Sequence, residues 1–155
     1  MLPISGNFRG LIMEKEAIGL KEYKRYLIDL EKVFSENKEK LTELDSVVGD
    51  GDHGENMVRG FSNVAEVLEE ENVEDFASLF QKIGQELVKS IGGAAGPIFG
   101  SFFLGMKEGV KGKTTLTLED LANCFEYGLK RVKKRGGAEP GDKTMVDVLE
   151  PVTKT

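Results

Sequence analysis

The chain has 155 residues, of which 39% are hydrophobic and 31% are charged, and its formal net charge is −6. That length and composition predict one domain with its own core and exclude a disordered chain, a collagen-like chain and a disulfide scaffold. The acidic balance argues against a nucleic-acid partner, and an anionic ligand would need metal cations or backbone N–H groups at its site.

Helical periodicity dominates from residue 20 onward, because apolar residues recur at spacings of three and four. We expect helices over roughly 20–35, 36–48, 57–68, 76–91, 97–106, 118–132 and 143–150. No segment reads as a strand. The sequence therefore predicts an all-α fold of six or seven helices, joined in three places by glycine-rich connections.

Several residues are placed to begin or end these helices. Ser35 should cap the second helix, which glycine at 49 should end. Thr117 with Asp120 should cap the sixth helix, and Asp142 should cap the last one. Pro151 should then stop the last helix.

Residues that bear on the compartment are few. The one cysteine, Cys124, lies in an apolar helical pattern and cannot form an intramolecular disulfide, which favours packing and a reducing cytoplasm. The sequence has no apolar run of about 20 residues, so we expect no membrane span. Residues 1–10 do not resemble a signal peptide.

The first glycine-rich connection carries most of the chemistry. Asp45, Asp50 and Asp52 place three carboxylates within eight residues, and hard dications bind several such oxygens. The alternative is a solvated turn rich in aspartate and glycine. An EF-hand is excluded, because the loop that starts at Asp50 has Phe61 where a glutamate ligand is required.

Two further residues of this connection suit an anionic ligand. His53 is the chain's one histidine, and it could donate to a phosphate oxygen or move a proton. Asn56 lies where the next helix opens, and free backbone N–H groups there favour anions.

The other two connections are weaker signals. The run 92–97, Gly-Gly-Ala-Ala-Gly-Pro, would let backbone N–H groups approach a phosphate, although a tight turn between helices has the same composition. In the run 136–145, Met145 could face a purine ring or fill the core, and its physics alone favours the core.

In order and spacing, the three motifs resemble those of the nucleotide-binding L subunits (DhaL) of dihydroxyacetone kinases, and the likeness covers about residues 20–152. The family fold is an antiparallel barrel of eight helices that holds the nucleotide at one rim. The resemblance implies an N-terminal extension over 1–19 and a nucleotide-binding domain over 20–155 that lacks its C-terminal helices.

The resemblance also implies roles for individual residues. Asp45, Asp50 and Asp52 would hold two Mg²⁺ ions that bridge the nucleotide phosphates. His53 would be the catalytic residue. The residues expected to contact ADP or ATP are His53, Gly54, Glu55, Asn56, Ala94, Ala95, Gly136 and Met145, the last two beside the adenine.

In this family ADP stays bound as a cofactor. A phosphohistidine-bearing M subunit of the phosphotransferase system recharges it, and the phosphoryl group passes to dihydroxyacetone on a separate K subunit. The related fatty-acid kinase domains tend to have threonine where His53 stands. The alternatives are a non-catalytic or regulatory nucleotide-binding relative, and the nucleotide domain of an ATP-dependent glycerone kinase or fatty-acid kinase.

Two departures from the family pattern stand out. Ala95 replaces a usual serine, which removes one hydroxyl from the phosphate site. The family continues beyond the position of Thr155 with further helices and an arginine-bearing closing loop. We therefore expect residues 1–155 alone to be inactive as a phosphotransferase.

Overall fold

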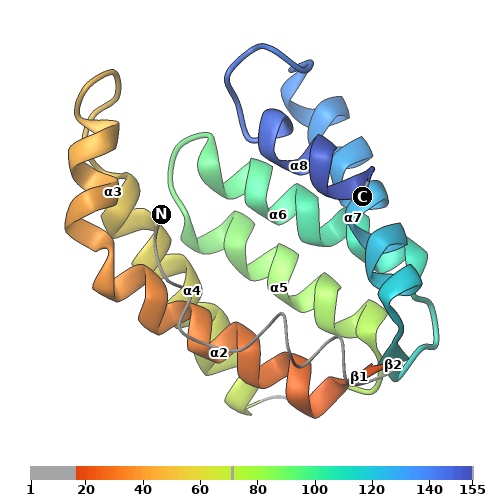
Figure 1. The fold of residues 1–155 in the computed structure, drawn as a ribbon. Helices are drawn as coiled ribbons and strands as arrows, with labels where there is room; N and C mark the ends of the chain where they lie inside the picture. The colour runs from red at the N-terminus through yellow and green to blue at the C-terminus, as the bar shows by residue number, and fades with distance from the viewer. Residues whose placement is uncertain (1–16, 71, 155) are drawn as a thin grey trace.

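Seven α-helices, one 3-10 turn and a pair of very short strands make up residues 17–70 and 72–154, which the computed structural model describes (Figure 1). In chain order they are β1 (Ile18–Gly19), α2 (Leu20–Glu36), α3 (Lys38–Asp45), α4 (His53–Glu70), α5 (Phe76–Ser90), α6 (Ala95–Met106), η1 (Lys107–Gly109), β2 (Thr115–Leu116), α7 (Leu118–Gly136) and α8 (Val146–Thr153). The predicted all-α fold of six to seven helices is confirmed. No helix of this part of the chain is long and apolar enough to cross a membrane.

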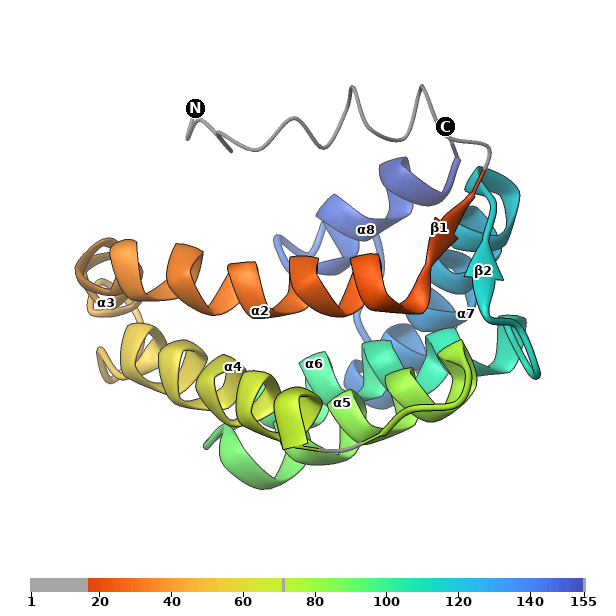
Figure 2. The ribbon, with the colours of Figure 1, turned by 90° about the horizontal axis from the view of Figure 1, so that it is seen from below.

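Neighbouring helices in the sequence are also neighbours in space. α4 packs on α2 and α3, and each helix from α5 to α8 packs on the helix before it. Figure 2 shows α2 and α8 on the same side of the layer formed by α4, α5 and α6. The connections α3–α4, α5–α6 and α7–α8 all lie at one end of the molecule, so the three glycine-rich motifs share that end (Figure 1).

α5 is the centre of the core. Its predicted apolar stripe is buried, with Phe76, Leu79, Phe80 and Leu87 each 0% exposed. The Phe76 and Phe80 rings also meet the edge of Tyr23 from α2, with centroids 5.4 and 5.6 Å apart. Burial of this stripe against neighbours on both sides fixes the order of helices around it.

Cys124 lies in the same core. It is 0% exposed, and burial raises the pKa of its thiol to about 12. A thiol that stays protonated at neutral pH is a poor nucleophile. The predicted packing role of Cys124 is confirmed.

The predicted boundaries of the second helix are wrong. α2 continues through Ser35, whose hydroxyl donates to Glu31 within the helix instead of capping the next one. α3 ends at Asp45 because the next residues turn back, and the N–H groups of Val48 and Gly49 both donate to the Asp45 carbonyl. Val48 is consequently 93% exposed instead of facing the core.

The C-terminal boundaries also differ from the prediction. α8 begins at Val146, and Asp142 does not cap it but accepts from the N–H of Glu139 at 2.9 Å. Asp147 instead accepts from the N–H groups of Gly141 and Thr144, which precede the helix. Pro151 lies inside α8, which runs two residues beyond it, so that expectation is wrong as well. The predicted Thr117–Asp120 cap of α7 is confirmed as a reciprocal capping box.

The expectation that the chain has no strand is also wrong. β1 and β2 pair antiparallel, with Ile18 opposite Leu116 and Gly19 opposite Thr115. A ladder of two residues per strand rests on backbone groups and needs no alternating side-chain pattern, so periodicity does not reveal it. It ties the start of α2 to the segment before α7.

The N-terminus of α5 gives a first testable prediction. Asp75 and Ser78 form a capping box, and the Asp75 carboxylate also accepts from the N–H of Gly112 at 3.1 Å. These bonds, Ser78 foremost, lower the pKa of Asp75. We expect Asp75→Ala to reduce the free energy of unfolding by about 1–2 kcal/mol at pH 7, the usual worth of such a cap.

The sign of the pH dependence follows from the lowered pKa. The stabilisation is fully present above the unfolded-state pKa of about 4 and is lost as pH falls through the lower folded-state pKa. Urea unfolding at pH 7 and below pH 3 should therefore show a smaller difference between wild type and Asp75→Ala in acid. Glu74→Ala, at the exposed neighbouring position, is the control. An equal loss at both pH values would contradict this explanation.

Candidate functional site

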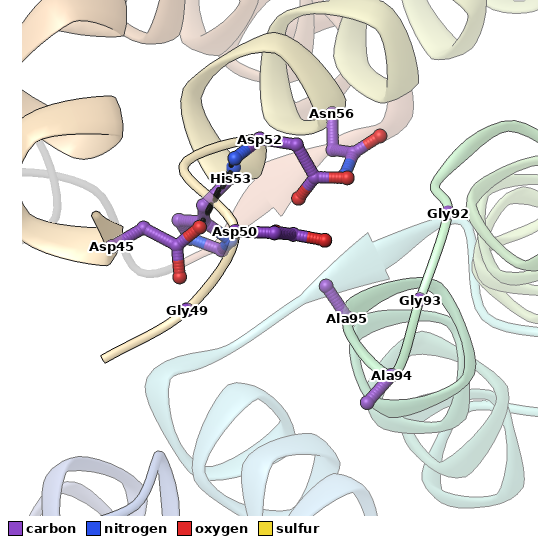
Figure 3. A pocket seen from close by; sticks show the side chains of 10 residues that line it. All are labelled: Asp45, Gly49, Asp50, Asp52, His53, Asn56, Gly92, Gly93, Ala94 and Ala95. Carbon is purple, nitrogen blue, oxygen red and sulfur yellow. Dashed lines mark hydrogen bonds between the residues drawn. The ribbon is translucent and has the colours of Figure 1, made fainter. Parts of the chain in front are cut away.

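A cavity of about 410 Å³ opens at the end of the molecule that carries the glycine-rich connections (Figure 3). Two connections face each other across it, the one between α3 and α4 and the one between α5 and α6. Its lining residues are Asp45, Gly49, Asp50, Asp52, His53, Asn56, Gly92, Gly93, Ala94 and Ala95. Segments that are about 40 residues apart in the sequence therefore form a single site.

Three carboxylates gather on one side of the cavity. Asp45, Asp50 and Asp52 each offer an oxygen atom, and these atoms lie within 4.8 Å of one another. Asp45 is half-buried and the other two are exposed. None of the three forms an ion pair with another described residue. Their negative charge is therefore left for a ligand to neutralise.

Asp45 also holds the loop in shape. Its Oδ2 atom accepts from the N–H groups of Gly51 at 2.9 Å, Asp52 at 3.1 Å and His53 at 3.4 Å. This single carboxylate thus satisfies N–H groups at the entrance to α4, where a helix has no internal acceptors.

Two glycines permit this loop. A Cβ atom on Gly49 would lie 2.4 Å from Asp45 Oδ1, which is closer than real Cβ contacts. Gly51 has a φ of +76°, a backbone conformation that residues other than glycine rarely adopt. The glycines in this motif therefore serve the close return of the chain onto Asp45.

The start of α4 contributes His53 and Asn56 to the cavity. His53 is the first residue of the helix and is half-buried. Asn56 is only 5% exposed, and its Oδ1 atom accepts from the Arg59 guanidinium. Arg59 donates in addition to the Ser90 carbonyl at 2.9 Å, so it links α4 to the last residue of α5. The sequence did not single out Arg59, because nothing local distinguishes it from the other charged helix residues.

The opposite wall is the connection that precedes α6. Ala94 is the N-cap residue of α6 and provides no side-chain cap, and Ala95 is the first helical residue. Pro97 lies in the first turn, as predicted, and has no N–H. The backbone N–H groups at this helix start are therefore available to an anion in the cavity.

Four of the predicted nucleotide contacts do not line this cavity. Gly54 packs against α3, where a Cβ atom would lie 2.2 Å from the Lys38 carbonyl oxygen. Glu55 pairs with Lys38 on the surface, and that partner lowers its pKa. Gly136 ends α7, and Met145 precedes α8 and packs on the core. Their roles toward a nucleotide stay predictions.

The donor set of this site consists of three carboxylates, which are ligands that suit a magnesium ion. Mg²⁺ prefers oxygen ligands, keeps several waters and is commonly held by one or two carboxylates together with phosphate oxygens. Asp45, Asp50 and Asp52 supply only oxygen, and the two exposed carboxylates leave room for water and phosphate. The residues present therefore fit Mg²⁺.

An all-helical domain that places three carboxylates opposite a helix N-terminus has the chemistry of a domain for a metal–phosphate ligand. Residues 47–155 match the DAK2 domain family, and the chain belongs to that family.

Relatives with established names extend the match toward the N-terminus. The chain is 41% identical over 128 residues to the ADP-binding subunit DhaL of a PEP-dependent dihydroxyacetone kinase of Listeria innocua. It is 46% identical over 123 residues to the corresponding subunit of Escherichia coli. These alignments cover 83% and 79% of this chain, but only 64% and 59% of the relatives. The chain thus spans about three fifths of their length.

Solved structures support the fold. The dihydroxyacetone kinase of Citrobacter freundii superposes with a TM-score of 0.71 at 28% identity, covering 84% of this chain and 24% of that protein. The same kinase in complex with AMP-PNP and Mg²⁺ superposes with a TM-score of 0.66 at 32% identity, covering 83% of this chain and 23% of that protein. The helices described above therefore superpose on about a quarter of the Citrobacter freundii kinase.

Proposed function

We propose that this chain is the nucleotide-binding part of a dihydroxyacetone kinase and holds ADP or ATP with Mg²⁺ in the cavity between α4 and α6. The observation that carries the proposal is the meeting, across a single cavity, of three carboxylates that have no ion-pair partner among the described residues with a helix N-terminus that has no side-chain cap. One wall suits metal ions, and the other suits phosphate oxygens.

Each wall has a distinct task in this proposal. Asp45, Asp50 and Asp52 would hold two Mg²⁺ ions, which when bound neutralise phosphate charge and polarise the phosphoryl group. His53 and Asn56 would donate to phosphate oxygens from the start of α4, and His53 is the candidate for a proton-moving role. The N–H groups that follow Ala94 would hold the phosphates from the opposite side.

We further propose the form in which the nucleotide subunit is a separate protein. The relatives named as ADP-binding subunits are 41–46% identical to this chain, whereas the dihydroxyacetone kinase of Citrobacter freundii, whose name mentions no subunit, is 34% identical. The partners would then be a K subunit that holds dihydroxyacetone and a phosphohistidine-bearing M subunit of the phosphotransferase system. We propose the cytoplasm as the compartment, because the lone buried Cys124 suits reducing conditions.

Binding of nucleotide to this chain is the first test. Titration calorimetry with ADP should show binding that requires Mg²⁺ and is abolished by EDTA. A phosphotransfer assay with K and M subunits then tests the activity, with phosphoenolpyruvate as the ultimate donor. ADP binding that is absent, or that is equally strong in EDTA, would contradict the proposed site.

A second candidate is the nucleotide domain of a kinase that uses ATP directly. The similarity to the dihydroxyacetone kinase of Citrobacter freundii, which has been solved in complex with AMP-PNP and Mg²⁺, favours it. The same assay separates the two, because the second candidate transfers phosphoryl groups from added ATP without the phosphohistidine protein.

Ala95 provides a prediction of gained affinity. Its position at the start of α6, in the cavity wall, would place a new hydroxyl near the phosphates. We expect Ala95→Ser to make the free energy of ADP binding more favourable by about 1 kcal/mol, the typical net contribution of one hydrogen bond. Calorimetry measures the change, and Ala77→Ser on α5, outside the cavity lining, is the control. A tenfold weakening would contradict the placement of this loop beside the phosphates.

A further inference from the structure

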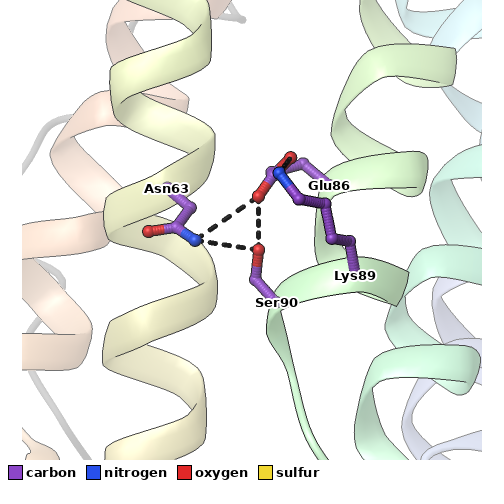
Figure 4. Close-up of polar contacts among 4 residues, drawn as sticks. All are labelled: Asn63, Glu86, Lys89 and Ser90. Carbon is purple, nitrogen blue, oxygen red and sulfur yellow. Dashed lines mark hydrogen bonds and ion pairs between the residues drawn. The ribbon is translucent and has the colours of Figure 1, made fainter.

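A chain of polar contacts joins α4 to the end of α5 beside the cavity. Ser90 lies at its centre, since its hydroxyl donates to the Glu86 carboxylate and accepts from the Asn63 amide at 2.9 Å (Figure 4). Lys89 completes the cluster with an ion pair to Glu86 at 3.3 Å. Ser90 is 9% exposed, so these bonds are largely shielded from water.

The Glu86 carboxylate remains an acceptor in this cluster. Burial raises the pKa of Glu86, but the hydrogen bonds from Ser90, Lys89 and Asn63 together lower it by more, so the net shift is downward. A charged, multiply bonded carboxylate holds the Ser90 side chain in one orientation. The backbone at Ser90, where α5 ends, is thereby fixed relative to α4.

Arg59 links the backbone at Ser90 to Asn56, a residue that lines the cavity. Its Nε donates to the Ser90 carbonyl at 2.9 Å, while its Nη2 donates to Asn56 Oδ1. A guanidinium has donors only and a rigid planar shape, so it dictates which end of the Asn56 amide faces it. The Asn56 Nδ2 group has no acceptor among the described residues and belongs to a residue that lines the cavity.

Arg59 also lies against the second loop. A Cβ atom on Gly92 would be 3.7 Å from Arg59 Nη2 and 3.4 Å from Asn56 Oδ1. The Arg59 guanidinium is thus packed between Asn56, in one wall of the cavity, and Gly92, at the start of the other wall. The Arg59 side chain therefore connects Asn56 on α4 with the backbone at Ser90, which leads into Gly92 and Gly93.

We propose that Arg59 is a positioning residue for the ligand phosphates: it turns the Asn56 amide so that Nδ2 faces the cavity. It acts through Asn56 and not by its own charge. This inference rests on the proposed nucleotide function, which supplies the anion that Nδ2 would bind.

A double-mutant cycle tests this route of action. We expect Arg59→Met to weaken Mg–ADP binding about tenfold in the wild-type background, and less than about twofold in the Asn56→Ala background. Arg59→Lys keeps the charge but loses the two-pronged geometry, so it should weaken binding nearly as much as Arg59→Met. Arg25→Met, at an exposed position on α2, is the matched control and should bind as wild type does.

Other outcomes would overturn the inference. An equal loss from Arg59→Met in both backgrounds, or full affinity in Arg59→Lys, would show that the charge itself contacts the phosphates. Should Arg59→Met fail to fold, as judged by its thermal unfolding, Arg59→Lys and its combination with Asn56→Ala complete the same cycle.

A measurement on the free protein separates this inference from the proposed function. In NMR spectra without nucleotide, we expect a slowly exchanging Arg59 Nε–H and one resolved pair of Asn56 Nδ2 protons, and broadening of that pair in Arg59→Lys. Wild type that fails to bind Mg–ADP would refute the nucleotide function, whereas unchanged Asn56 signals in Arg59→Lys would refute the positioning by Arg59.

Discussion

Replacing Asp50 or Asp52 by asparagine is expected to weaken Mg-dependent ADP binding by about a hundredfold or more, because each change removes a charged oxygen ligand from a site built on three. Asparagine has nearly the same shape as aspartate, so the loop should keep its course. Calorimetry with ADP and Mg²⁺ measures the loss. Glu39→Gln, an exposed carboxylate on α3, is the matched control.

The same variants should behave in the opposite way without metal. Three carboxylates whose oxygen atoms lie within 4.8 Å of one another repel, so removing the charge of Asp50 or Asp52 should leave the metal-free protein at least as stable as wild type. Thermal unfolding with and without Mg²⁺ gives the readout, since a ligand that binds only the folded state raises the melting temperature. A full magnesium-induced shift in Asp50→Asn would show that the ion is not held here.

Gly54→Ala is expected to have the second large effect, on stability. A Cβ atom there would lie 2.2 Å from the Lys38 carbonyl and 2.4 Å from Thr42 Oγ1, both on α3. Backbone cannot be displaced as a flexible side chain can, so α3 must move away from α4. We expect a loss of about 2–3 kcal/mol in the free energy of unfolding, in the upper range for overpacked sites.

Urea denaturation measures this effect, with Gly19→Ala as the control. Gly19 has a negative φ and no atom within 4 Å of an added Cβ, so the same substitution should cost little there. Displacement of α3 would also move Asp45, and Gly54→Ala should therefore bind Mg²⁺ less well even at temperatures where it is folded. Unchanged stability would mean that α3 and α4 are not in such close contact.

Much of the fold could be predicted because its driving force is local in sequence. The stripe that includes Leu79, Phe80 and Ile83 has helical spacing, and the structure buries all three. The meeting of Asp45, Asp50 and Asp52 could be predicted for a similar reason, because all three lie within eight residues of the sequence. Their oxygen atoms lie within 4.8 Å of one another, as the predicted metal site requires.

The features that could not be predicted depend on contacts between distant segments. Arg59 contacts Ser90, 31 residues away, only because α4 and α5 pack in a particular register. α3 ends early because two kinds of acceptor compete for the N–H groups that follow it. In a further helical turn these N–H groups would donate to backbone carbonyls, but in the loop they donate to the Asp45 carboxylate. Neither outcome follows from the propensity of the residues involved.

The several bonds to Asp45 make this residue a link between ion occupancy and loop order. Its Oδ2 atom already accepts three N–H groups, so an ion bound to the same carboxylate would hold that side chain, and the loop backbone bonded to it, in one position. Hydrogen exchange at the amides of Gly51, Asp52 and His53 should consequently slow when Mg²⁺ is added. The backbone of this loop would thus report on the ion without any label, in a part of the chain where the ligands themselves are spectroscopically silent.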